Sequence, residues 1–243
     1  MKKASAWNQY HIKLIMAFLM VLDHLDHVPG LLSENLAMAF HVLSRCVAVW
    51  FAYCVVEGVR YTRDLRGYLL RLYLAAGGML LGNLTLRMLL RSKDIPVSNN
   101  IFLTLALGAT MVTALRHIPR KSLKILAAAV ILAVGSITAE GGITVLPFML
   151  IADLNYDNPR LRDVWCLVLS AVLLIISYVP YGTLEETLSM LAFNSDFLFI
   201  LVIPILHLYN GQRGTAGKFG KYFFYIFYPA HLWLLALIAY WAS

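Results

Sequence analysis

The chain has 243 residues, of which 60% are hydrophobic and 14% are charged, and its mean hydropathy is +0.73. Soluble domains carry roughly a quarter charged residues, so this composition excludes a water-soluble globular protein. The apolar residues fall in runs of about 18–22, the length that crosses a ~30 Å hydrocarbon layer as a helix. Because these runs lack the period-two alternation of membrane barrels, we expect an all-α polytopic membrane protein with one domain over residues 1–243.

Hydrophobic stretches follow one another along the chain and are joined by short polar connections. They predict a bundle of about nine transmembrane helices, at 11–29, 36–57, 68–90, 99–116, 122–139, 141–154, 163–180, 187–208 and 221–241. The sixth stretch is short and contains Pro147, so it is a candidate re-entrant segment. The eighth contains Asn194, Ser195 and Asp196, where we expect a break. The first stretch lacks a signal-peptide cleavage site and is expected to be retained.

The net charge of +7 would suit nucleic-acid binding, but the distribution of the basic residues indicates membrane topology instead. With a cytoplasmic amino terminus, nine spans place sixteen of the 20 Lys and Arg residues on the inner side. Only Arg87, Arg91 and Lys93 fall on the outer side, and Arg45 lies within the second span. This asymmetry follows the positive-inside rule. We therefore expect a cytoplasmic amino terminus and a lipid bilayer, not nucleic acid, as the partner of the basic residues.

The densest group of ionisable side chains inside a predicted span is the segment Asp23–His27, with two aspartates and two histidines. Such groups cost at least a few kcal/mol in a bilayer, so they are functional candidates. One alternative is that the segment only marks the polar end of a helix before Pro29. Another is a metal site, although His24 and His27 alone do not form a distinctive zinc pattern.

Two histidines from opposite ends of the chain are predicted to reach similar depths. Lys13 and His24 are eleven positions apart and share a helix face, which places His24 about 16 Å beyond Lys13. His231 follows Lys221 by ten positions, a distance of about 15 Å along a helix. Arg45 is expected near mid-depth as well and requires a carboxylate, carbonyl groups or a water-filled cavity there.

A cluster of arginines is predicted at the cytoplasmic end of the second and third spans. Arg60, Arg63, Arg66 and Arg71 lie beside Glu57 in the sequence. An ordinary positive-inside loop that touches anionic lipid explains them sufficiently. A cradle for a phosphorylated ligand is the functional alternative, because guanidinium groups match phosphate oxygens bidentately.

Motifs spread along the whole chain resemble the TraX family. The matching segments are Lys13–His24, Leu43–Arg45, Cys54–Arg63, Tyr68–Leu72, Asn100–Gly108, Leu208–Gly214 and Lys221–His231. The first of them resembles the family's L-K-x-I-A-x-x-x-M-x-x-D-H opening. TraX proteins are known as pilin acetylases of conjugative plasmids, and the family is similar to acyltransferase-3 membrane enzymes. Those enzymes have a basic residue, ten intervening positions and a catalytic histidine, which Lys13 and His24 match.

The resemblance implies an acyltransferase in the cytoplasmic membrane of a bacterium. Cytoplasmic acetyl-CoA would be the acyl donor, and no metal is expected. The acceptor would be an amine or hydroxyl on an extracytoplasmic peptide or envelope glycan, and nothing in the sequence indicates pilin. In this interpretation His24 is the general base, Asp23 orients its ring, Arg45 stabilises the oxyanion and His231 forms a second polar wall. The donor-binding candidates are Lys13, Glu57, Arg60, Arg63, Arg71, Asn100, Tyr209, Asn210, Arg213, Lys221, Tyr225 and Tyr228.

Two other classes of function fit the same polar groups. A proton-coupled transporter or channel would use the intramembrane His, Asp and Arg side chains as a relay. That class predicts inverted repeats with matching helix breaks, and we find none in the sequence. A scaffold would use the polar residues only to hold helices together.

Overall fold

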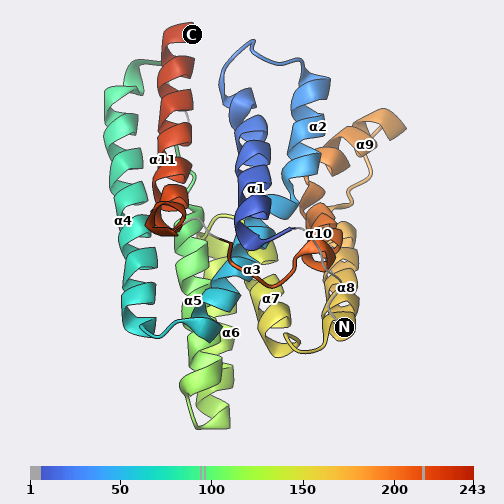
Figure 1. Ribbon diagram of the computed structural model, residues 1–243. Coiled ribbons are helices and arrows are strands. Elements are labelled where there is room, and N and C mark those ends of the chain that lie inside the picture. The colour runs from blue at the N-terminus through green and yellow to red at the C-terminus, as the bar shows by residue number, and fades with distance from the viewer. Residues whose placement is uncertain (1–6, 94, 96, 215–216) are drawn as a thin grey trace. The chain divides into compact units, whose positions relative to one another are not determined.

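The computed structural model is helical throughout the part of the chain that it describes, which is residues 7–93, 95, 97–214 and 217–243, with side chains of the last helix from Tyr222 onward (Figure 1). Helices account for 82% of the protein, and the described residues form no strand. An isolated parallel bridge joins Trp7 to Tyr209. The all-α prediction is therefore confirmed.

Each predicted span contains helical structure with bounds close to those expected. The helices are α1 (Gln9–His24), η1 (Leu25–His27), α2 (Glu34–Ser44), α3 (Cys46–Tyr61), α4 (Leu65–Leu89), η2 (Arg91–Lys93), α5 (Ile101–His117), α6 (Lys121–Thr138), α7 (Gly142–Leu154), α8 (Pro159–Ser177), α9 (Leu184–Phe193), η3 (Ser195–Leu201), α10 (Val202–Leu208) and α11 (Gly217–Ala242). The expected break in the eighth span is confirmed, because Leu184–Phe193 and Ser195–Leu208 are bent by 59° at Asn194.

Fewer helices than expected are long and apolar enough to cross a membrane. Among the described residues, four pass by length and composition: Glu34–Tyr61, Leu65–Leu89, Lys121–Thr138 and Tyr222–Ala242. The bent pair at Asn194 raises the number to five. Helix α7 has 13 residues, α1 has 16 and α5 has 17, which is short of the ~20 that a span needs. The apolar helices indicate a multi-pass membrane protein, but neither nine spans nor the orientation of the amino terminus is confirmed.

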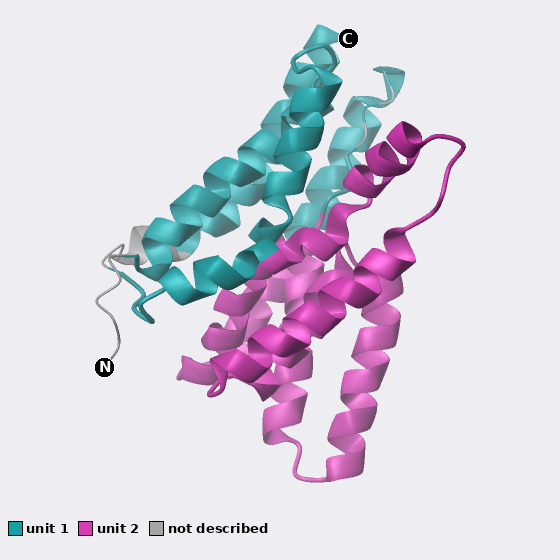
Figure 2. Ribbon diagram, turned by 90° about the vertical axis from the view of Figure 1, so that its right-hand side faces the viewer, with its two compact units in different colours: residues 1–47, 78–99, 201–243 teal, residues 48–77, 100–200 magenta. Residues whose placement is uncertain are grey.

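The chain divides into two compact units (Figure 2). Unit 1 comprises residues 1–47, 78–99 and 201–243, so it brings together the two ends of the sequence and the second half of α4. Unit 2 comprises residues 48–77 and 100–200. The single-domain interpretation of the sequence stays a prediction.

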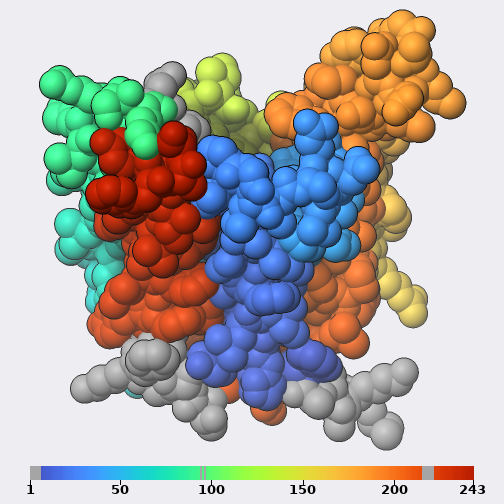
Figure 3. Space-filling view, turned by 90° about the horizontal axis from the view of Figure 1, so that it is seen from above, coloured from blue at the N-terminus to red at the C-terminus, as the bar shows by residue number. Residues whose placement is uncertain are grey.

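In unit 1, α1 packs against α2 and α11, which lie side by side with it in the space-filling view (Figure 3). The buried face of α1 includes Ile12, Met16, Met20 and His24, which recur every four residues. That spacing places their side chains on one stripe of the helix. His24 therefore occupies a core position of α1 even though it is ionisable.

A second contact in unit 1 holds α4 against α11. The indole Nε1 of Trp233 donates a hydrogen bond to Oδ1 of Asn83 at 3.0 Å. A Cβ added at Gly82 would overlap the ring of Trp233. The glycine thus makes room for a large aromatic side chain between the two helices.

In unit 2, α5, α6 and α7 pack against one another, and α8 packs against α7. The turn that enters α7 requires glycine twice. Gly141 has a φ of +63°, in the left-handed region that L side chains rarely adopt. A Cβ at Gly142 would overlap the backbone carbonyl oxygen of Gly135 in α6. The close approach of α6 and α7 therefore depends on the missing side chain at position 142.

We predict that Gly142→Ala destabilises the protein by about 1–3 kcal/mol, because backbone atoms of Gly135 cannot move aside as a flexible side chain would. Gly77→Ala in α4 is the matched control, since an added Cβ there would meet no atom within 4 Å. Alanine also favours a helix over glycine by roughly 0.5–1 kcal/mol, so the control should unfold at the same or a higher temperature. Thermal unfolding in detergent checks both, and equal effects would contradict the packing argument.

Candidate functional site

The two histidines predicted at similar depth are in direct contact in unit 1. Nδ1 of His24 lies 3.2 Å from Nε2 of His231, and the ring centroids are 5.2 Å apart. His24 ends α1 and His231 lies within α11. Both side chains are buried, with 9% and 7% of their surface exposed. The structure thus joins residues 207 positions apart in one polar contact inside an apolar seam.

The hydrogen bonds around His231 determine which nitrogen of each neutral ring carries a proton. Nδ1 of His231 lies 2.9 Å from the carbonyl oxygen of Phe227. A carbonyl oxygen only accepts, so Nδ1 of His231 donates and its Nε2 is left as an acceptor. Nδ1 of His24 must then donate to that acceptor, which leaves the lone pair of His24 on Nε2. We infer this tautomer from the contacts. It gives His24 a nitrogen that can accept a proton.

His27 brings a third imidazole to this cluster. Its ring centroid is 5.2 Å from that of His24, and its Nε2 lies 3.9 Å from Oδ1 of Asp26. Among the described residues, no group of three or more His, Cys, Asp or Glu side chains is arranged to hold a metal ion.

Asp23 and Arg45 form an ion pair that connects α1 to the end of α2. Oδ2 of Asp23 lies 3.3 Å from a guanidinium nitrogen of Arg45, and its Oδ1 lies 3.4 Å from Nδ1 of His41. Nε of Arg45 donates to the carbonyl oxygen of His41 at 3.0 Å. Arg45 therefore has the carboxylate and the carbonyl that its expected depth requires. The Asp23 carboxylate contacts Arg45 and His41, while Nδ1 of His24 contacts His231, so the orienting role of Asp23 stays a prediction.

Two further candidates lie on the seam between α1 and α11. Nζ of Lys13 lies over the ring of Phe224, 5.5 Å from its centroid. Because Lys13 and His24 both contact α11, the prediction that they share a helix face is confirmed. Tyr228 is buried and packs edge-on against His231, with ring centroids 5.7 Å apart. The Tyr225 side chain is half-buried in the same helix.

The donor-binding candidates in the segment after α10 lie beside the chain that precedes α1. The backbone N–H of Asn210 donates to the carbonyl of Trp7 at 3.0 Å, and its side-chain oxygen accepts from the Gln212 backbone at 2.9 Å. Tyr209 forms the bridge with Trp7, and Arg213 is exposed. These contacts fix the chain ahead of α1. The side chain of Lys221 lies outside the described residues.

The other donor-binding candidates lie in unit 2, where most already have protein partners. Oε1 of Glu57 accepts from the Tyr156 hydroxyl at 3.0 Å. Burial, with neighbouring Tyr61 and Glu57, raises the pKa of the Tyr156 phenol, so it stays a hydrogen-bond donor. Arg71 lies 3.9 Å from Asp64. The side-chain amide of Asn100 donates to the carbonyl of Ala76 at 3.0 Å. Arg63, by contrast, is exposed.

Arg60 is held by a carboxylate that the sequence interpretation missed. Its guanidinium lies 2.7 Å from Oδ1 of Asp153 and 4.0 Å from the centroid of the Tyr156 ring. Asp153 is buried and lies 3.3 Å from Arg116 as well. A lone carboxylate at the end of the apolar stretch 141–154 was the available signal. The charge of Arg60 is thus matched inside the protein.

Comparison with known proteins identifies the family. The model of the family described as TraX protein matches residues 8–239, which is nearly the whole chain and includes both histidines of the seam. No curated protein and no solved structure matches the chain. A match of this extent shows membership, and the chain belongs to the TraX protein family.

Proposed function

We propose that this protein is a membrane acyltransferase that moves an acetyl group from acetyl-CoA to an amine or hydroxyl, with His24 as general base. The observation that carries the proposal is the buried contact of His24 with His231, whose hydrogen bonds leave a proton-accepting nitrogen on His24. Family membership and the spacing of Lys13 and His24 support the choice of acyl transfer.

In the proposed reaction, one proton moves from the acceptor to His24 and then from His24 to the leaving thiolate. Nε2 of His24 takes the proton of the acceptor N–H or O–H while the acceptor atom bonds to the thioester carbonyl carbon. The carbon–sulfur bond then breaks, and the coenzyme thiolate takes the proton from the imidazolium. His231 accepts the hydrogen bond of His24 Nδ1 throughout and stabilises the imidazolium, as the third member of a catalytic triad does.

Asp23 and Arg45 have a positioning role in this proposal. Their ion pair holds the end of α1, where His24 lies, against α2. Oxyanion stabilisation by Arg45 would require its guanidinium to contact the substrate in addition to Asp23 and His41.

The donor and the acceptor follow from chemistry that the family implies. The phosphates of acetyl-CoA suit an exposed guanidinium such as that of Arg213, which belongs to unit 1 together with His24. The acceptor is proposed to be an extracytoplasmic peptide amino terminus or an envelope glycan. The proposed location is the cytoplasmic membrane of a bacterium.

The same contact favours a second function, a proton-coupled transporter or channel. Two imidazoles in contact within apolar helices are suited to passing a proton between them. Radiolabelled acetyl-CoA separates the two functions, because only the acyltransferase hydrolyses or transfers the acetyl group. Proton flux in vesicles without acetyl-CoA would favour the transporter.

We predict that His24→Ala lowers acetyl transfer by about 10²–10⁴-fold, the usual contribution of a general base. His11→Ala is the control, because His11 lies on the same helix with an exposed side chain. Acetyl transfer is measured with purified protein whose thermal unfolding is unchanged. Full activity of the His24 variant would remove it from the mechanism.

We predict that His231→Leu lowers the rate roughly 5- to 150-fold, because His24 loses its buried hydrogen bond to His231 at a cost of about 1–3 kcal/mol. His231→Gln should restore most of the rate, since its side-chain oxygen accepts the same hydrogen bond. A role in packing alone predicts the opposite order, with leucine closer to the wild type. Initial rates of the two variants at saturating acetyl-CoA decide between these outcomes.

A further inference from the structure

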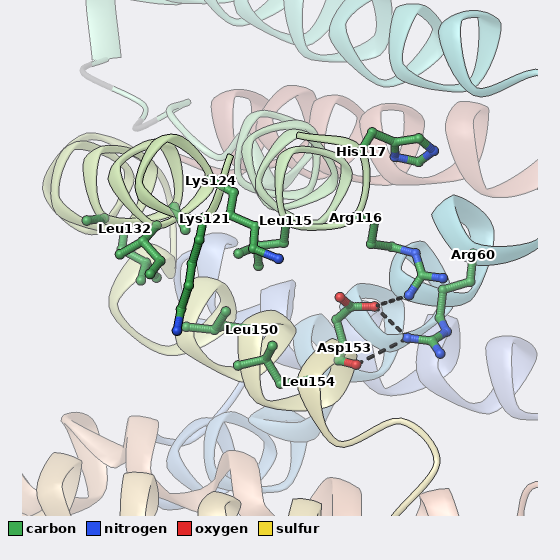
Figure 4. A pocket seen from close by; sticks show the side chains of 13 residues that line it. Arg60, Leu115, Arg116, His117, Lys121, Lys124, Leu132, Leu150, Asp153 and Leu154 are labelled. Carbon is green, nitrogen blue, oxygen red and sulfur yellow. Dashed lines mark hydrogen bonds and ion pairs between the residues drawn. The ribbon is translucent and has the colours of Figure 1, made fainter. Parts of the chain in front are cut away.

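Unit 2 contains an open groove of about 860 Å³ between α5, α6 and α7 (Figure 4). Both basic and hydrocarbon side chains line it. The ionisable side chains that line it are Arg60, Arg116, His117, Lys121, Lys124 and Asp153. The remaining lining residues are leucine, isoleucine and alanine. Of the donor-binding candidates named from the sequence, Arg60 lines the groove, and the described lining includes neither His24 nor His231.

The groove has more positive than negative side chains, and two lysines account for the excess. Asp153 is its one acidic lining residue among those described, and it is already paired with Arg60 at 2.7 Å and Arg116 at 3.3 Å. Lys121 and Lys124 add two positive charges that this carboxylate does not offset. They extend from α6 over the groove toward leucines of α5 and α7 (Figure 4). The lining therefore presents ammonium groups beside hydrocarbon.

The backbone adds to this attraction for an anion. Helix α6 begins at Lys121, and its N-cap residue Arg120 makes no side-chain hydrogen bond to the first turn. Backbone N–H groups at a helix start carry a partial positive charge and bind phosphate groups readily. The two lysines of the lining lie in this same first turn.

The hydrocarbon side of the groove faces the surroundings that a membrane supplies. Helix α6 is one of the four candidate spans, and only 11% of its most apolar 18-residue stretch is buried within the protein. Ile125 lines the groove and is 53% exposed. A helix with so little of its apolar surface buried presents that surface to lipid chains.

The lining fits a lipid better than a nucleotide. A nucleotide base is usually held by aromatic stacking and by hydrogen-bonding amides or hydroxyls. Among the described lining residues, the imidazole of His117 is the one aromatic ring, and no hydroxyl or amide side chain is present. The predicted cytoplasmic location of Arg116–Lys124 also matches the leaflet that carries anionic lipid.

We propose that this groove binds one anionic phospholipid, with its phosphate between Lys121 and Lys124 and the start of an acyl chain against the leucines of α5, α6 and α7. The proposal is independent of the acyltransferase function. It predicts a stoichiometric lipid that survives purification and holds the α5–α6–α7 group of helices together.

Native mass spectrometry of the full-length protein in detergent, titrated with phosphatidylglycerol or phosphatidylcholine, tests the proposal. We expect one phosphatidylglycerol to bind more tightly than phosphatidylcholine. Lys121→Gln with Lys124→Gln should weaken that binding roughly 25-fold, because each lysine near an anionic headgroup contributes about fivefold. Lys121→Arg with Lys124→Arg should retain it and shows that the sites tolerate substitution.

Arg66→Gln with Arg160→Gln is the matched control, since both side chains are exposed, the pair removes the same charge, and neither residue lines the groove or lies at the start of α6. Equal weakening in the control pair would mean general surface attraction and would overturn the proposal. Glycerophosphoglycerol and coenzyme A test the source of the phosphate. Competition by either one at the affinity of the lipid would show an anion site without a lipid requirement, which also overturns it.

Discussion

The contact between His24 and His231 joins α1 to α11 through two buried imidazoles. A buried imidazole must find a hydrogen bond, because an unsatisfied polar group in such surroundings costs about 1–3 kcal/mol. The carbonyl of Phe227 satisfies one nitrogen of His231, and His24 satisfies the other. The direction of every hydrogen bond in the chain of groups then follows from that single carbonyl. The fold thereby selects the tautomer of a side chain 207 positions away in sequence.

Buried carboxylates in both units also have partners, which are cationic side chains. In unit 1, Asp23 lies against Arg45 and His41, and in unit 2, Asp153 lies between two arginines. Removing one member of such a pair leaves a charge without compensation, which costs more than the pair contributes. The ion pairs therefore restrict how the helices of each unit can be placed. In unit 1 this restriction acts on the residue next to His24.

Local sequence patterns predicted the helices and part of the site, because hydropathy and helical spacing are properties of neighbouring residues. The eleven-residue spacing predicted that Lys13 and His24 share a helix face, and the structure shows both in contact with α11. The polar residues at Asn194 marked a real break. The number of spans could not be predicted in the same way. Apolar runs such as 141–154 indicate burial equally well in protein and in lipid, and α7 has only 13 residues. The pairing of Asp23 with Arg45 could not be predicted either, because it depends on how α2 packs against α1, and the sequence of α1 alone does not determine that packing.

The basic residues show why sequence position alone cannot identify an anion site. Arg60 lies in the predicted arginine cluster, but its charge is matched by Asp153, 93 positions later. Lys121 and Lys124 appeared to be ordinary positive-inside residues, yet they line a groove in which the one carboxylate is already paired. What distinguishes the two cases is the three-dimensional location of a single acid. In a protein with a net charge of +7, the cations that remain without a carboxylate are the ones available to phosphate, so anion recognition is decided by where the few acids fold.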